Sequence, residues 1–170
     1  MIELMITVLL ISVGLAGYLH SIVQSSMTAE SNKRMAIAAQ RGRVIMESIK
    51  STDFGDVFAT FNADPADDPG GVGTAVGATF AADGLQATAA DADGIVGQIL
   101  FPVAGGTPGV LREDIANPVF GTPRDLSGDG VTDGNDHSGD YQLLPVVVRM
   151  AWRTPKGNAR LEFKTVLVDL

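Results

Sequence analysis

Five side chains with oxygen donors fall at a defined spacing in the twelve-residue segment D-L-S-G-D-G-V-T-D-G-N-D, residues 125–136. Counted from the start of the segment, they stand at positions one, three, five, nine and twelve: Asp125, Ser127, Asp129, Asp133 and Asp136. Four carboxylates in one short loop repel each other unless a cation lies among them. A hard cation with six or more oxygen ligands suits such a loop, and calcium tolerates irregular geometry better than magnesium does. The spacing therefore predicts a calcium site.

Two further residues complete the pattern. Gly130 stands at position six, where the loop must turn sharply, and the Val131 carbonyl would be the ligand at position seven. This is the EF-hand spacing with Asp in place of the final Glu, and it resembles the dockerin-type calcium loop more closely than the calmodulin type. Because Pro118 and Pro123 precede Asp125, the resemblance covers the loop and not a pair of helices. We expect a structural clip that pins this segment against the C-terminal strands. The alternative is a solvated Asp/Gly turn without an ion.

The chain has no cysteine and only two histidines. The lack of cysteine excludes disulfides, thiolate zinc sites and cysteine nucleophiles, and it leaves a bound metal as another way to staple the fold. Neither His20 nor His137 has a serine and an acid at the spacing of a catalytic triad. We expect His137 to be exposed. The sequence contains no phosphate-binding loop, zincin helix or nucleophile elbow, so an enzyme is not expected.

Charge is distributed unevenly along the 170 residues. The formal net charge is −8, but residues 51–140 contain fifteen acids against only Arg112 and Arg124, a local balance of −13. A surface that binds nucleic acid needs the opposite sign, so nucleic acid is not an expected partner.

The N-terminus is dominated by an apolar run from Leu4 to Val23, with a single carboxylate, Glu3, at its edge. About 20 such residues in a helix would cross the hydrocarbon core of a bilayer. A charge at the rim of a membrane helix is costly and usually has a partner. We expect that partner to come from another copy of the same protein.

Residues 1–52 are predicted to form one long helix, because good helix formers are frequent and no proline precedes Pro65. Its first half (1–24) is apolar all round and should protrude into a membrane or a filament core. Its second half (25–52) should lie on a folded head. One apolar stripe recurs there at steps of three and four: Met35, Ala38, Gly42, Ile45 and Ile49.

The remaining residues, 53–170, are predicted to form a globular β head. The stretch 53–93 is rich in Gly, Ala, Asp and Pro and is typical of a long surface connection. The expected strands are a short one near 78–80, one over 94–103, and the arms of a C-terminal hairpin at 146–153 and 159–168. Trp152 and Phe163, from opposite arms, are expected in the core. The fold class is therefore α+β, a long helix packed on a small antiparallel sheet.

The N-terminal run also resembles a known family. Ile2-Glu3-Leu4-Met5-Ile6, followed by Leu9-Leu10-Ile11-Ser12-Val13-Gly14-Leu15, is similar to the N-terminal helix of type IV pilins and of the pseudopilins of type II secretion. The acid of that family is fifth in the mature chain and here is third, and His20 stands at the place of its helix-bending proline.

The resemblance implies subunits that wait in the inner membrane, are extracted by an assembly ATPase machine and bundle their apolar helices in a helical extracellular filament. Glu3 would then pair with the terminal amine of the adjacent subunit. The residues implied in assembly are Glu3, Leu4, Leu9, Leu10, Val13, Gly14 and Leu15.

Two other interpretations remain open at this point. The first is a minor pilin or pseudopilin that primes a filament or a secretion piston, favoured by the S-V-G-L-A-G stretch. The second is a monomeric, membrane-anchored domain that binds calcium or serves in adhesion and never polymerises.

Overall fold

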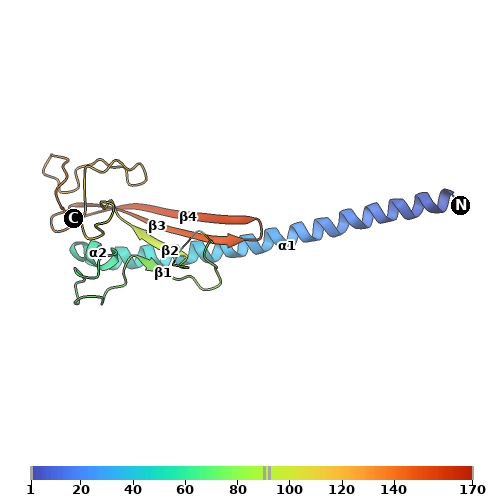
Figure 1. Ribbon diagram of the computed structural model, residues 1–170, viewed down its shortest axis with the longest axis horizontal. Coiled ribbons are helices and arrows are strands. Elements are labelled where there is room, and N and C mark those ends of the chain that lie inside the picture. Colours follow the sequence, from blue (N-terminus) through green and yellow to red (C-terminus); the bar gives the residue numbers. More distant parts are fainter. Residues whose placement is uncertain (1, 90, 92, 170) are drawn as a thin grey trace.

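The computed structural model describes every residue except 1, 90, 92 and 170. In chain order, its elements are α1 (Ile2–Ser51), α2 (Phe54–Phe61), β1 (Thr79–Phe80), β2 (Gly97–Leu100), β3 (Leu143–Thr154) and β4 (Gly157–Val168). The long helix packs on a four-stranded antiparallel sheet that ends in a C-terminal hairpin (Figure 1). The predicted α+β fold is confirmed.

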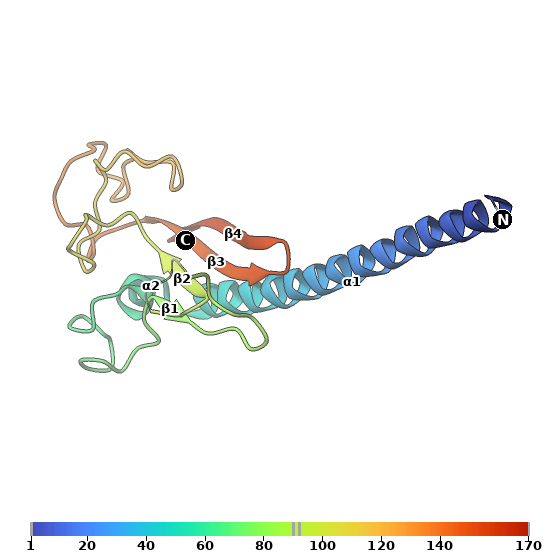
Figure 2. The same cartoon turned by 45° about the vertical axis from the view of Figure 1, so that its right-hand side comes forward.

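The two halves of α1 have different surroundings. The N-terminal half extends away from the head as a rod, and the C-terminal half lies along the sheet (Figures 1 and 2). The buried residues of the helix are Ala38, Gly42, Ile45, Met46 and Ile49. The expected stripe is therefore present from Ala38 onward, whereas Met35 is exposed and Met46 belongs to the packed face instead.

Gly42 allows α1 and β4 to approach closely. A Cβ atom built at this position would collide with the ring of Phe163, and no larger residue fits without moving that ring. Glycine is unfavourable inside a helix by roughly 0.5–1 kcal/mol relative to alanine. Close packing between the helix and the sheet offsets this cost.

The sheet has the strand order β1-β2-β3-β4, and each neighbouring pair is antiparallel. Val148 in the centre of β3 stands opposite Ile99 on β2 and Phe163 on β4. Alternate residues of β3 are completely buried, as a period of two predicts: Val146, Val148, Met150 and Trp152. Trp152 is thus a core residue as expected, and Phe163 packs partly buried against the same core.

The tip of the β3–β4 hairpin is attached to α1 at the base of the rod. Nη1 of Arg34 donates a hydrogen bond to the carbonyl of Arg153 at 2.7 Å, and Nζ of Lys156 donates to Oγ1 of Thr28 at 3.1 Å. Arg34 also pairs with Glu30 at 2.8 Å. The head therefore holds the helix from Thr28 onward.

The expectation that residues 53–93 form only surface loops and a short strand is wrong at its N-terminal end, where α2 occupies Phe54–Phe61. Phe54, Val57, Phe58 and Phe61 are spaced for one face of a helix, and the last three are buried. Tyr141 adds a polar attachment, since its hydroxyl donates to the carbonyl of Phe54 at 2.6 Å. Burial of this apolar face outweighs the loop-forming composition of the longer stretch.

Candidate functional sites

The first candidate site is the exposed rod of α1. Its large apolar side chains, from Ile2 to Val23, are all solvent-exposed, and Leu10 in the middle keeps 64% of its surface. The most apolar 18-residue window of this helix has a mean hydropathy of 2.1, and none of it is buried in the head. By length and composition, the helix can cross a membrane.

The polar groups on the rod are few, and two of its hydroxyls donate back to the helix. Thr7 donates to the carbonyl of Glu3 at 2.8 Å, and Ser12 donates to the carbonyl of Val8 at 2.7 Å. Across the part of the chain that the structure describes, no hydrogen bond or ion pair reaches the Glu3 carboxylate. The rod therefore presents an apolar surface with one charged group at its tip.

The structure places all of the predicted assembly residues on this rod. The five large apolar residues are exposed: Leu4, Leu9, Leu10, Val13 and Leu15. No described residue of the head lies within 4 Å of a Cβ atom built at Gly14. The head covers none of this set.

The second candidate site is the acidic loop. All four of its carboxylates accept hydrogen bonds from backbone N–H groups. Asp125 accepts from Gly128 N at 2.6 Å and Gly130 N at 2.8 Å, and Asp129 accepts from Val131 N at 2.7 Å. The N–H groups of Gly130 and Gly128 outweigh burial and lower the pKa of Asp125. Gly130 has a φ of 85°, the sharp turn expected at position six.

The remaining predicted ligands have different partners. Asp136 accepts from Leu111 N at 3.2 Å and from Ser138 N at 3.0 Å, which fastens the end of the loop to the segment before it. The Ser127 hydroxyl lies 3.4 Å from an Asp125 oxygen, and Val131 is exposed. Asp133 instead turns toward residues that the sequence pattern does not include.

A compact group forms where Asp133 meets Glu113 and His137. Nε2 of His137 lies 3.2 Å from Oδ1 of Asp133 and 3.7 Å from Oε2 of Glu113. One ligand atom from each of the three residues falls within 4.8 Å of the other two, and among the described residues no other set of three His, Cys, Asp or Glu side chains does so. Asp125, Asp129 and Asp136 are not part of this group.

Glu113 is the centre of this arrangement. Its carboxylate has no exposed surface, and Oε1 accepts hydrogen bonds from Leu126 N at 2.6 Å and Ser127 N at 2.8 Å. Oε2 faces His137 and receives a longer contact from Asp133 N at 3.4 Å. Sequence reasoning did not find Glu113, because nothing in L-R-E-D distinguishes it from the neighbouring acid.

The expectation that His137 is exposed is wrong, since only 5% of the residue remains accessible. Its backbone N–H donates to Leu111 O at 2.9 Å, which draws the ring inward, and Nδ1 lies 3.1 Å from Oδ1 of Asp140. Burial lowers the pKa of the imidazole. The hydrogen bonds to Asp133 and Asp140 and the charge of Glu113 raise this pKa by a larger amount, so the net shift is upward.

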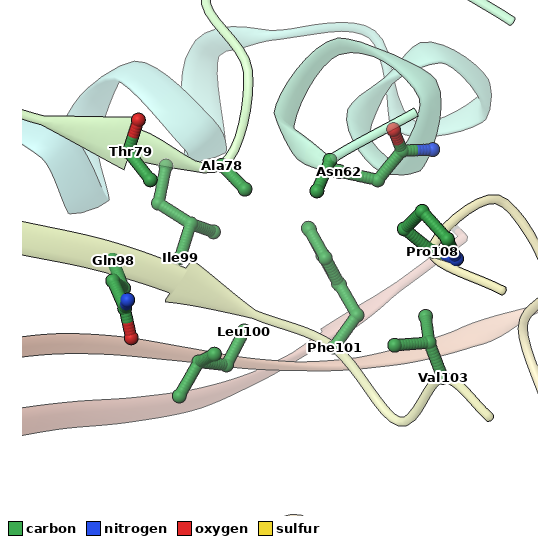
Figure 3. A pocket seen from close by; sticks show the side chains of 10 residues that line it. Asn62, Ala78, Thr79, Gln98, Ile99, Leu100, Phe101, Val103 and Pro108 are labelled. Atoms are coloured by element: carbon green, nitrogen blue, oxygen red, sulfur yellow. The ribbon is translucent and has the colours of Figure 1, made fainter. Parts of the chain in front are cut away.

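A separate apolar cavity of about 220 Å³ lies between the end of α2, β1 and β2. Figure 3 shows Phe101 extending from the end of β2 toward Asn62, with Val103 and Pro108 at one side. The Asn62 amide is already occupied, because Nδ2 donates to Asp67 at 2.7 Å and Oδ1 accepts from Asp64 N at 2.7 Å. The lining is mainly apolar and the Asn62 amide is not free to orient a ligand, so the cavity is interpreted as a gap in packing.

Comparisons of the chain with models of protein families, with curated proteins and with solved structures find no match.

Proposed function

We propose that this chain is the structural subunit of a filament resembling type IV pili, and that it polymerises through the rod of α1. The observation that supports this most is the contrast within one helix. Its second half is buried on the head, while the whole first half exposes large apolar side chains. Such a surface is not stable in water and requires either lipid or protein around it.

The free energy of apolar burial favours a bundle of identical rods as the final surroundings of each rod. Burying one large apolar side chain contributes roughly 1.5–3 kcal/mol, so a bundle of rods gains far more than any polar surface contact. Glu3 has a different role in assembly, which is to align the subunits. In a dry bundle an unpaired carboxylate is expensive, so subunits are aligned where the Glu3 of one meets a cation, such as a terminal amine, of the next.

Before assembly the same rod is proposed to anchor the subunit in the inner membrane, and after extraction by an assembly machine the filament lies outside the cell. A monomeric, membrane-anchored domain shares the first state but not the second. The two proposals differ in whether Glu3 matters, because an anchor has no use for a carboxylate at its tip.

The substitution Glu3→Leu separates them. The full chain is expressed in a bacterium that assembles type IV pili, sheared fibres are imaged by negative stain, and membrane fractions are assayed for the subunit. We expect wild-type fibres, a strong loss of fibres in Glu3→Leu, and unchanged membrane association. The control Val72→Leu alters an exposed apolar residue of the head and should leave both unchanged.

Absence of wild-type fibres, or a fibre yield that Glu3→Leu does not change, contradicts the proposal. The amount of the protein in purified fibres distinguishes a major subunit, which forms their bulk, from a minor pilin or pseudopilin.

Calcium in the loop of residues 125–136 stays a prediction of the sequence, and it would act as a structural clip in the head. Calorimetric titration of the full chain with calcium should show binding that disappears in Asp129→Ala. A wild type that releases no heat would remove this site.

A further inference from the structure

We propose that Glu113, Asp133 and His137 form a binding site for one divalent transition-metal ion of the zinc class, which shares only Asp133 with the predicted calcium loop. The ligand atoms are Oε2 of Glu113, Oδ1 of Asp133 and Nε2 of His137. The site lies in the head and is independent of whether the rod polymerises.

The separations of His137 Nε2 from the two carboxylate oxygens are close to those in a metal shell. Zinc binds nitrogen and carboxylate oxygen at about 2.0–2.2 Å in a tetrahedron, which places neighbouring ligands roughly 3.3–3.5 Å apart. The imidazole Nε2 lies 3.2 Å from Asp133 Oδ1 and 3.7 Å from Glu113 Oε2, on both sides of that value. A hydrogen bond between charged groups is shorter, about 2.7–2.9 Å. The three atoms can therefore surround an ion, and in its absence the shorter separation serves as a hydrogen bond between His137 and Asp133.

Both buried ligands are oriented by groups behind them. Asp140 lies 3.1 Å from Nδ1 of His137, and a carboxylate at that nitrogen directs Nε2 toward the centre, as in the carboxylate–histidine–zinc arrangement. Leu126 N and Ser127 N hold Oε1 of Glu113, so that Oε2 is the oxygen that faces the imidazole. These contacts come from outside the three ligands and fix two of them before an ion arrives.

The local charge also calls for a cation. Three carboxylates, those of Glu113, Asp133 and Asp140, surround one imidazole, and Glu113 is wholly buried. The direct partner of the nearby Arg112 is Asp114, which holds its guanidinium through two contacts of 2.9 and 2.5 Å, and of the three carboxylates only that of Asp133 interacts with its charge. A divalent ion would supply positive charge at this site. Because the site is buried, a carboxylate charge without a partner there is costly in free energy.

The imidazole nitrogen decides the class of metal. Calcium and magnesium take oxygen ligands, whereas a site with imidazole and carboxylates suits zinc and related transition metals. The side chain of Asp133 is 35% exposed, which leaves a way in for the ion and room for water as a fourth ligand. Bound metal would join residues 113, 133 and 137 and staple the loop region of a chain that has no disulfide.

The test is zinc titration of the full chain in detergent after removal of metal with a chelator. We expect one equivalent of Zn²⁺ to bind, and Co²⁺ in its place to give the visible absorption of a tetrahedral nitrogen–oxygen site. His137→Gln and Asp133→Asn should each weaken zinc binding at least tenfold. The matched control Asp129→Ala removes a carboxylate from the same loop without touching the ligands, and should bind zinc like the wild type.

Three results overturn the proposal: no saturable zinc binding, zinc binding that neither His137→Gln nor Asp133→Asn weakens, or a loss in Asp129→Ala as large as in His137→Gln. The last would place the ion in the predicted calcium loop. Fluorescence of the single tryptophan, Trp152, confirms that each variant is folded. If the buried His137→Gln does not fold, Asp133→Asn at the partly exposed ligand decides the question.

Discussion

Glu113 and Asp114 are adjacent acids, but replacing each by alanine should have very different consequences for stability. Glu113 is wholly buried and accepts hydrogen bonds from two backbone N–H groups, at 2.6 and 2.8 Å. Hydrogen bonds to a charged group contribute about 1.5–3 kcal/mol each, so Glu113→Ala should lower the free energy of unfolding by about 3–6 kcal/mol. That is a large part of the 5–15 kcal/mol typical of a whole domain, on the order of half. Asp114 is exposed and pairs with Arg112 at the surface, where such pairs contribute little.

The assay is denaturant unfolding of the full chain in detergent, followed by Trp152 fluorescence. Trp152 is completely buried in the head, so its emission reports on head unfolding and not on the rod. A chelator in every sample removes any contribution of bound metal. Glu113→Gln should fall between the wild type and Glu113→Ala, because the amide oxygen still accepts a hydrogen bond but carries no charge.

Unfolding of Glu113→Ala and Asp114→Ala at the same denaturant concentration would contradict this prediction. Equal midpoints would mean that the loop of residues 111–140 is not held by the Glu113 carboxylate. The inference about a metal ligand at that position would then lose its structural support.

Two other predictions concern the core and the outer face of the sheet. Ile49→Ala, at a wholly buried position of α1, should destabilise the head by roughly 2–5 kcal/mol. Val44→Ala, on the exposed side of the same helix, should have little effect. Equal effects of the two substitutions in the same unfolding assay would contradict the packing described for α1. Burial raises the pKa of Glu162, but hydrogen bonds from Arg149 and Arg160 outweigh it, and the net shift is downward. A lowered folded-state pKa adds stability above the unfolded value of about 4.3, and this part is lost as the pH falls through the folded value. Unfolding measured from neutral to acidic pH should therefore show that Glu162→Gln is less stable than the wild type at neutral pH, and that the two converge on acidification; a constant difference would show that Glu162 does not titrate in this way.

Local pattern was sufficient for the long helix and the hairpin. In β3 a large apolar residue stands at every second position from Val146 to Trp152, and the stripe from Ala38 to Ile49 repeats at helical spacing, so each element could be recognised from its own residues. The helix α2 was not predicted, although its own residues indicate a helix. Its eight residues carry a clear apolar face. The stretch that follows is rich in Gly, Ala and Asp, and this composition led to the prediction of a surface loop for the whole segment.

The exposed rod was also predictable from the sequence alone, because a run of about 20 apolar residues is too long and too uniform to be one face of a buried helix. The acidic loop was visible through the spacing of its oxygen donors. The residues with which Asp133 associates were not visible, since Glu113 lies twenty positions earlier and His137 carried no signal beyond its type.

The amino-acid sequence by itself determined which segments are helical or extended and which faces are apolar, because these depend on periodicities over a few neighbouring residues. Only the tertiary structure decided which of two adjacent acids is buried and which histidine nitrogen faces it. Burial and ligand geometry depend on groups that chain folding brings together from distant positions, and the free energy of a carboxylate changes far more with its surroundings than with its sequence neighbours.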